Sequence, residues 1–400
     1  MLELAQKSNE KERFMINSIN LLVTVGLLNA TNAYELAVDN VRIYQPEKGN
    51  YSSPARIYVK DGKIVEIDSI SAQEKPASTR IDGKSHYATP GLTDLHVHLS
   101  ASGSNYSNFQ QVPVESHLNS NLYLGVTQVV DLFSSQQLLD EVKRLSAAKN
   151  TPDLFYAGML FTNKGGHGTQ FGSEALEISS DEDIPQLWAK HMQMKPFVTK
   201  AVIESFGGHG TTLTDSQLKA LGDRSKAAGL PYFVHVSTLE DGKRAIRAGA
   251  TALAHGISSE AIDDEFIQLM KANNVAYIPT LAVMLNHSGE KESQAVSRET
   301  QLLEVAPEKL KRCLFTNVPT PSKWLNDIWN KRHHAFDNIK KLHQAGVSIG
   351  TGSDAGNPYT LHGTGLHNEF LLLSEAGLSN QEIMDKVRVA YQQGRFKQKL

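Results

Sequence analysis

Two histidines stand two residues apart in the stretch PGLTDLHVHL, at His96 and His98. The apolar residues around them favour a β-strand, in which successive side chains point to opposite faces. Both imidazoles then share one face, while Leu95 and Val97 point to the other. Two imidazoles on one face are placed to hold one object together, and imidazole is a frequent ligand of zinc and related metals.

Composition restricts what that object and its partners can be. The chain has 400 residues, of which 40% are hydrophobic and 21% charged, and its formal net charge is -3. These values are typical of a globular protein that can bury a barrel-sized core and a smaller domain. The charges are interspersed without a basic cluster, so we expect a small-molecule substrate and no nucleic-acid partner. The single cysteine, Cys313, leaves His, Asp, Glu or a modified Lys to bind metal.

Residues 1–33 have the pattern of a secretory signal. Lys11 and Arg13 precede an apolar run at residues 21–28, and small residues follow up to Ala33. This order predicts cleavage after Ala33 and a secreted or periplasmic protein. The run is shorter than the roughly 20 apolar residues that span a bilayer, so we expect no membrane span. A tail without fixed structure is the alternative.

Residues 34–88 predict a small β domain. Short runs such as ARIYVKDGKIVEID alternate apolar and polar residues. Asp61 and Gly62 lie between two such runs, and an Asp-Gly pair there is a strong signal for a hairpin turn.

From residue 89 to residue 400, short apolar runs alternate with helical patterns. We place eight strands, at residues 93–98, 126–133, 154–160, 197–203, 232–236, 252–255, 275–281 and 347–350. Repeated strand-helix alternation of this kind predicts an α/β fold, a (β/α)8 TIM barrel. A doubly wound open sheet is the alternative, although no GxGxxG motif follows an early strand.

Polar residues stand where a barrel would place its active site, at the carboxyl ends of strands. The candidates are His96 and His98 in the first strand, Lys200 within the fourth, His235 at the end of the fifth, His255 at the end of the sixth and Asp354 after the eighth. In a barrel, all six side chains converge on one mouth.

The motifs PGLTDLHVH, FVTKAVI, FVHV, LAHG and GTGSDAG, in this order, resemble the amidohydrolase superfamily, and in particular its imidazolonepropionase-like and prolidase-like (Xaa-Pro dipeptidase-like) branch. The resemblance implies two divalent metal ions, with zinc expected. It also implies their ligands, which are His96, His98, Lys200, His235, His255 and Asp354. In the family the HxH pair binds the more buried ion, and the lysine of strand four is carboxylated and bridges both ions. The two later histidines bind the second ion, and the aspartate is both a ligand and a proton shuttle.

The chemistry of Lys200 is consistent with this role. Burial disfavours a charged amine, so the neutral form can react with carbon dioxide to give a carbamate, which is an anion able to bridge two metals. Two ions lower the pKa of a bridging water, and Asp354 would take its proton and pass it to the leaving nitrogen. If Lys200 were only an ion-pair partner, the site would hold one metal.

The sequence GGHGT occurs twice, at Gly165–Thr169 and Gly207–Thr211. Both copies follow predicted strands, and glycines let a loop approach a ligand closely. We therefore expect His167 and His209 to contact substrate. A chance likeness of loop composition is the alternative.

The chain departs from the family at its end. Family members return after the barrel to finish the sheet domain, whereas this chain stops at VAYQQGRFKQKL. We therefore expect an incomplete β-sandwich that leaves residues such as Val59, Ile64 and Val65 open, and a homo-oligomer is one way to cover them.

The function expected from these features is hydrolysis of a carbon–nitrogen bond in a small substrate, such as a dipeptide or an N-acyl amino acid. A phosphotriester or lactone hydrolase could use the same metals. A truncated, non-catalytic metal-binding homologue is a further alternative, although none of the six candidate residues is lost.

Overall fold

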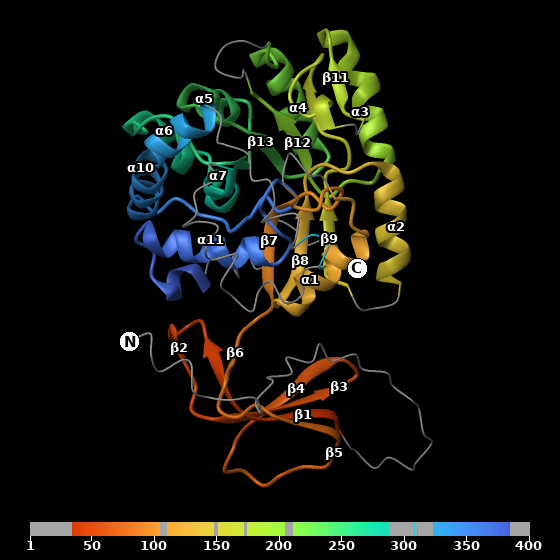
Figure 1. The fold of residues 1–400 in the computed structure, drawn as a ribbon, viewed down its shortest axis with the longest axis vertical. Coiled ribbons are helices and arrows are strands. Elements are labelled where there is room, and N and C mark those ends of the chain that lie inside the picture. The colour runs from red at the N-terminus through yellow and green to blue at the C-terminus, as the bar shows by residue number, and fades with distance from the viewer. Residues whose placement is uncertain are drawn as a thin grey trace.

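The computed structural model describes residues 34–104, 110–147, 151–171, 174–204, 211–287, 308, 310 and 323–384. The predicted signal region and His209 lie outside these residues. An N-terminal sheet lies below a larger body of helices and parallel strands (Figure 1). The fold is therefore mixed α/β with an additional N-terminal sheet. In the described ranges no helix is long and apolar enough to cross a membrane.

The N-terminal sheet is built around its first strand. Its strands are β1 (Tyr34–Gln45), β2 (Asn50–Tyr51), β3 (Ala55–Lys60), β4 (Lys63–Ser69), β5 (Ala77–Asp82) and β6 (Tyr87–Ala88). Strand β1 pairs antiparallel with β2 and β3 and parallel with β5 and β6. Asp61 and Gly62, with φ of 52° and 69°, turn β3 into the antiparallel β4 and confirm the predicted hairpin.

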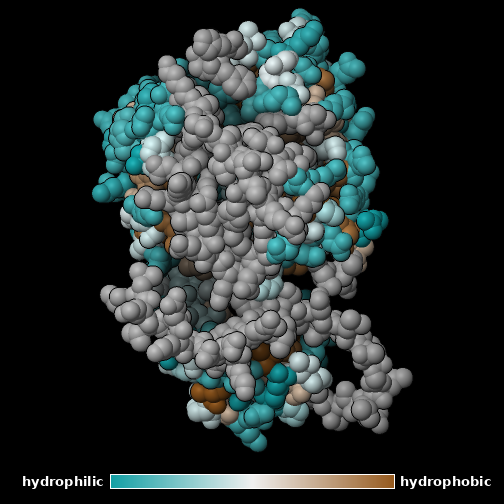
Figure 2. All heavy atoms as spheres, viewed as in Figure 1, coloured by the Kyte–Doolittle hydropathy of each residue, from teal (hydrophilic) through white to brown (hydrophobic). Residues whose placement is uncertain are grey.

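Strand β4 forms an edge of this sheet and is poorly covered. Ile64, Val65 and Ile67 are 62%, 52% and 53% exposed, and brown atoms are visible on this part of the molecule in Figure 2. The expectation that Ile64 and Val65 are open is confirmed, whereas Val59 of β3 is only partly exposed.

The larger body contains two parallel sheets. One has the order β7-β8-β9, and the other has the order β11-β10-β12-β13-β14-β15. Their bounds are β7 (Leu92–Val97), β8 (Val126–Asp131), β9 (Asp153–Tyr156), β10 (Phe161–Asn163), β11 (Leu176–Ile178), β12 (Thr199–Val202), β13 (Tyr232–His235), β14 (Ala252–Ala254) and β15 (Ala276–Ile278). Every residue of β7 and β12 is buried, as expected for parallel strands covered on both faces.

Helices follow most of these strands along the chain and pack around them (Figure 1). They are α1 (Val114–Tyr123), α2 (Gln136–Ser146), α3 (Ile184–Gln193), α4 (Asp215–Ala227), α5 (Leu239–Arg247), α6 (Asp264–Ala272), α7 (Leu281–His287), α10 (Lys323–Gln344) and α11 (Thr364–Glu375). Thr214, Thr238 and Asp263 each accept a backbone hydrogen bond at the first turn of α4, α5 and α6. These caps define where the helices begin, and thus how soon the chain turns after a strand.

Backbone hydrogen bonds connect the two parallel sheets. Phe197 N donates to Tyr156 O over 2.8 Å, next to β9. The segment at residues 347–355 lies between the opposite edges of the two sheets and bonds to both. Tyr277 N of β15 donates to Ser348 O (2.8 Å), and Leu95 N of β7 donates to Thr351 O (2.9 Å). This segment contains the predicted eighth strand, but its pairing is limited to isolated bridges, such as the one between Tyr277 and Ile349.

Two predicted strands end three or more residues earlier than expected. The third is interrupted at Gly158, whose φ of 70° is left-handed, and pairing resumes in β10. The seventh stops at Ile278, because Pro279 has no N–H to donate. Thr280 then takes a left-handed φ of 48°, and α7 begins at the next residue.

Candidate metal centre

His96 of β7 and His98, which directly follows this strand, meet an aspartate from the far end of the chain. His96 is fully buried, and its Nε2 lies 3.3 Å from Asp354 Oδ1. His98 Nε2 lies 3.0 Å from the same oxygen. One ligand atom from each of the three residues can be chosen so that all lie within 4.8 Å of one another. The structure therefore brings three of the six predicted ligands close enough together to share one metal ion.

A buried carboxylate in β7 holds the segment that carries Asp354. Asp94 Oδ1 accepts from Ser353 N (2.9 Å), and Asp94 Oδ2 accepts from Ser353 Oγ (2.5 Å). Asp354 N donates to His96 O over 2.8 Å, although Asp354 has a left-handed φ of 58°. Such backbone geometry is uncommon for a residue other than glycine and is often found at functional sites. Burial raises the pKa of Asp94 to about 7.

His235, at the end of β13, and His255, directly after β14, lie on the other side of this cluster. The ring centroid of His255 is 4.7 Å from that of His96 and 4.4 Å from that of His235. His255 Nδ1 lies 3.7 Å from Asp354 Oδ2. Burial lowers the pKa of His96 and of His255 well below the ordinary value, so both rings keep a lone pair for a ligand at neutral pH.

Lys200 of β12 is buried in the middle of the body. Lys200 is 2% exposed, and its Nζ has no hydrogen-bond partner among the described residues. Burial lowers its pKa to about 7, with a smaller opposing effect from Asp354. The amine is therefore available in the neutral form that attacks carbon dioxide.

The donor atoms fit a divalent metal. Within the part of the chain that the structure describes, His96 Nε2 and Asp354 Oδ1 also lack a hydrogen-bond partner while buried. Buried polar atoms are normally satisfied, and each exception needs an explanation. Imidazole nitrogens and a carboxylate oxygen are the ligands that zinc prefers when cysteine is not used.

Two further side chains border His235. The ring of His167 lies 5.1 Å from it, and Gln170 Nε2 lies 2.8 Å from His167 Nδ1. Glu204 Oε2 lies 3.5 Å from His235 Nε2. His167 therefore lies beside His235, and its contact with substrate stays a prediction, whereas Glu204 was missed. The signal was weak, because one acidic residue after a strand resembles any loop residue.

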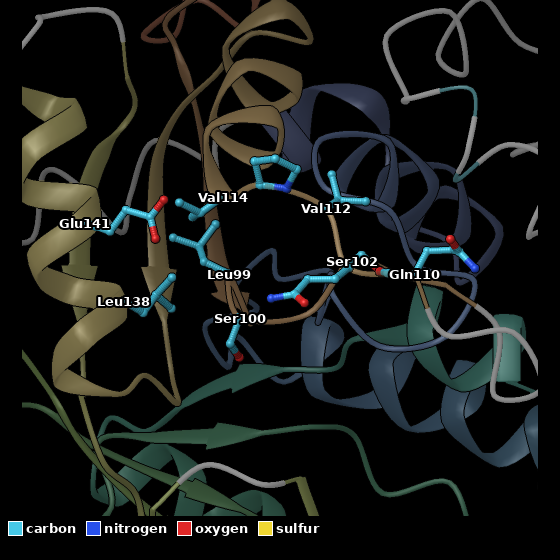
Figure 3. A pocket seen from close by; sticks show the side chains of 10 residues that line it. Leu99, Ser100, Ser102, Gln110, Val112, Val114, Leu138 and Glu141 are labelled. Atoms are coloured by element: carbon cyan, nitrogen blue, oxygen red, sulfur yellow. The ribbon is translucent and has the colours of Figure 1, made fainter.

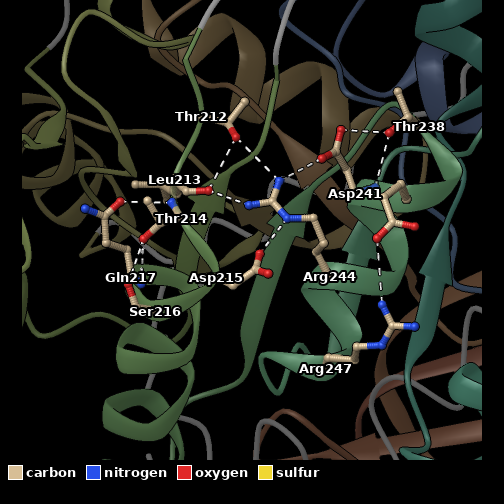
Figure 4. A network of polar contacts seen from close by, with 11 residues as sticks. Thr212, Leu213, Thr214, Asp215, Ser216, Gln217, Thr238, Asp241, Arg244 and Arg247 are labelled. Atoms are coloured by element: carbon tan, nitrogen blue, oxygen red, sulfur yellow. Dashed lines mark hydrogen bonds and ion pairs between the residues drawn. The ribbon is translucent and has the colours of Figure 1, made fainter. Parts of the chain in front are cut away.

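An arginine links the segments that follow two of the ligand strands (Figure 4). Arg244 of α5 donates to Leu213 O (2.7 Å), Asp215 Oδ1 (2.6 Å) and Asp241 Oδ1 (3.0 Å). The start of α4, which follows Lys200 along the chain, is thereby fixed to α5, which follows His235. The network holds together the two helices that follow the strands carrying these side chains.

A cavity of about 540 Å³ lies beside the chain that leaves β7. Leu99 and Ser100 line it directly after His98, and Leu138 and Glu141 of α2 face it from the other side (Figure 3). Its wall combines apolar side chains with a carboxylate and hydroxyl groups. Residues adjacent to the HxH pair in sequence thus form a hollow of a size suited to a small molecule.

Comparison with known proteins identifies the family. The model of the Amidohydrolase family matches residues 87–395. A dihydroorotase from Anaeromyxobacter dehalogenans (strain 2CP-C) is 24% identical over 244 residues, which are 57% of this chain and 48% of the relative. The chain thus spans about half of that relative's length.

Solved structures agree in fold. A Xaa-Pro dipeptidase with methionine bound in its active site matches with a TM-score of 0.70 at 18% identity, covering 90% of this chain and 88% of the other. A prolidase complexed with N-methylphosphonate-L-proline matches with a TM-score of 0.65 at 17% identity, covering 88% and 85%. The family match spans most of the chain and confirms the resemblance seen in the motifs, so the chain belongs to the Amidohydrolase family.

Proposed function

We propose that the chain is a binuclear metal-dependent amidohydrolase that cleaves an amide or peptide bond in a small substrate, such as a dipeptide or an N-acyl amino acid. The observation that carries this proposal is the cluster of His96, His98 and Asp354, whose ligand atoms lie within 4.8 Å of one another. Among the described residues, the buried His96 Nε2 and Asp354 Oδ1 have no hydrogen-bond partner. The likeness to a prolidase and a Xaa-Pro dipeptidase supports the choice of substrate class.

The proposal includes the predicted architecture. We propose a closed (β/α)8 barrel over residues 89–400 beside a small β domain over residues 34–88. Backbone hydrogen bonds support closure of the barrel. Phe197 bonds to Tyr156 between the two parallel sheets, and the segment at residues 347–355 bonds to Leu95 of one sheet and to Tyr277 of the other. In a barrel, the carboxyl ends of all strands meet at one mouth.

The six predicted residues divide into two sets of ligands. His96, His98 and Asp354 would hold the first ion, and His235 and His255 the second. A carbamate on Lys200 would bridge them, which the buried and unpartnered Nζ supports. Bound divalent ions would supply Lewis acidity and lower the pKa of water.

Asp354 is placed to move the proton. Its Oδ1 faces the histidines of β7, and its Oδ2 faces His255 at 3.7 Å, so the carboxylate stands between the two sets of ligands. In the proposed reaction, this carboxylate accepts a proton from the attacking water and donates it to the leaving nitrogen. Its strained backbone, held by Ser353 and Asp94, keeps it from turning away.

The remaining parts of the proposal rest on the sequence pattern. His167, beside His235, is a proposed substrate contact, and His209 is a second one that lies outside the described residues. The signal pattern of residues 1–33 supports a secreted or periplasmic location. A homo-oligomer is proposed on the exposed apolar residues of β4.

A substrate panel tests the proposed function. Protein reconstituted with zinc and bicarbonate is assayed on dipeptides, N-acyl amino acids, lactones and phosphotriesters, with Asp354→Asn as the control for contaminating enzymes. We expect hydrolysis of amides that the control lacks. Turnover confined to lactones or phosphotriesters would favour a lactone or phosphotriester hydrolase. Metal binding without any turnover would favour a non-catalytic homologue.

A further inference from the structure

A threonine beside the second pair of histidines is not explained by the proposed ligand sets. Thr280 lies between the end of β15 and the start of α7 and is 1% exposed. Its Oγ1 lies 2.8 Å from Nδ1 of His255. The hydroxyl therefore contacts the ring nitrogen of a candidate ligand from a different strand.

The backbone at this position is strained in a way that aims the hydroxyl. Thr280 has a left-handed φ of 48°, which is rare for a β-branched residue. The two segments are also bonded directly, since His255 N donates to Ile278 O (2.9 Å) and Gly256 N donates to Pro279 O (3.0 Å). The chain thus keeps an unfavourable turn at the point where it meets His255.

A buried carboxylate holds the residues that follow the turn. Glu369 of α11 is fully buried, and its Oε2 accepts from Ala282 N over 2.7 Å at the first turn of α7. An acceptor at the start of a helix satisfies an N–H that has no partner within the helix. Glu369 therefore fixes α7 in register directly after Thr280.

We propose that Thr280 is a positioning residue for His255, and that Glu369 holds Thr280 in place. The hydroxyl engages Nδ1, so the ring plane is fixed and Nε2 is the nitrogen left to bind metal. A partner on the second ring nitrogen is how proteins orient ligating histidines, and loss of such a partner typically weakens metal binding by about 10–100-fold. The inference rests on the proposed function in that it assigns His255 to the second ion.

Four variants test the contact. Thr280→Val keeps the β-branched shape but removes the hydroxyl, and Thr280→Ser keeps the hydroxyl. Thr280→Gly removes the hydroxyl and also relieves the left-handed strain, so it folds even if valine is not tolerated. Thr199→Val is the matched control, because Thr199 is also a buried threonine and its hydroxyl has no partner among the described residues.

The first readout is the affinity of the metal-free protein for zinc, measured by titration calorimetry. We expect Thr280→Val and Thr280→Gly to bind the first equivalent normally and the second about 10–100-fold more weakly. Thr280→Ser and Thr199→Val should match the wild type. A second ion bound by Thr280→Gly with wild-type affinity would overturn the proposal.

The second readout is the orientation of the His255 ring in metal-free crystals, which does not depend on the proposed function. The ring should keep its position in the wild type and in Thr280→Ser, and should rotate in Thr280→Gly. An unmoved ring overturns the positioning role whatever the metal content. A wild type that takes up only one ion would instead contradict the two-ion proposal, while the ring orientation would still decide the role of Thr280.

Discussion

The two sides of the candidate centre differ in how much of a metal site the chain forms by itself. On the side of β7, His96, His98 and Asp354 bring their ligand atoms within 4.8 Å of one another. On the side of β12 to β14, His235 Nε2 faces Glu204 at 3.5 Å, and Lys200 ends in an amine rather than a ligand for a cation. The first side has its donors in place, whereas the second needs a chemical change at Lys200.

The physical origin of this difference lies in the backbone. His96 lies in β7 and His98 directly follows it, so the two rings share a face. Asp354 is bonded through its own N–H to His96 O. The donors of the second side come from three separate strands. Their relative positions depend on contacts outside the centre, such as those of Arg244 and Thr280. We therefore expect the first ion to bind independently and the second to depend on these supports.

Loss of a ligand on the first side should have the largest effect. His98→Ala removes one of three clustered donors, so we expect loss of both ions and of detectable hydrolysis. Elemental analysis and the substrate panel provide the measurement. The matched control is His86→Ala, because His86 is an exposed histidine of the N-terminal sheet. This variant should keep both ions and the hydrolytic activity. Full metal content in His98→Ala would contradict the assignment of His98 as a ligand of the first ion.

Asp354→Asn should leave substrate binding largely intact while turnover falls. The amide keeps an oxygen that can accept but cannot take up the proton of the attacking water. We expect kcat to fall by about 10²–10⁴-fold, the usual contribution of general acid–base catalysis, with little change in KM. Steady-state kinetics measure both constants, and an unchanged kcat would remove Asp354 from the proton transfer.

Lys200→Ala should separate the two sides of the centre. Without a bridging carboxylate we expect the second ion to bind on the order of 100-fold more weakly while the first remains. A small carboxylic acid added to the solution should partly restore the second ion and activity. Lys219→Ala, an exposed lysine on α4, serves as the control. Wild-type activity in Lys200→Ala would mean that this lysine is only structural.

Glu369→Gln should have the smallest effect on metal content and turnover, because it changes the pH dependence of stability and not the candidate centre. Burial raises the pKa of Glu369 to about 8 from an ordinary 4.5, so the folded chain keeps a proton that the unfolded chain releases. The wild-type stability that this proton gives is full below pH 4.5 and is lost as the pH rises through about 8. Each unit of pKa difference corresponds to about 1.4 kcal/mol.

Glutamine keeps an acceptor for Ala282 N but cannot ionise. The melting temperature of the wild type should therefore fall relative to that of Glu369→Gln between about pH 5 and pH 8. Thermal melts of the two metal-free proteins across this range measure the difference. Parallel curves would show that Glu369 does not carry the buried proton.

Much of the first side could be predicted because its information is local. The spacing of His96 and His98 specifies a shared face in any strand, and an aspartate after a glycine-rich strand end stood out in GTGSDAG. The hairpin at Asp61 and Gly62 was predictable for the same reason, since only the turn itself decides it.

The supports of the second side could not be predicted, because they depend on contacts between distant parts of the chain. Thr280 follows an ordinary apolar run, and nothing in its neighbourhood indicates a left-handed turn beside His255. Glu369 lies 87 residues from the amide it accepts, within a helical pattern in which a glutamate normally faces solvent. Asp94 was overlooked, although it shares the face of His96 and His98 in strand β7.

The metal content of the wild-type protein tests the central claim most directly. Protein purified without chelator and supplied with zinc and bicarbonate should contain about two equivalents of metal per chain. Elemental analysis gives this number, and omission of bicarbonate after metal removal should lower it toward one. A content that stays at or below one equivalent, with no gain on adding zinc and bicarbonate, would contradict the binuclear centre.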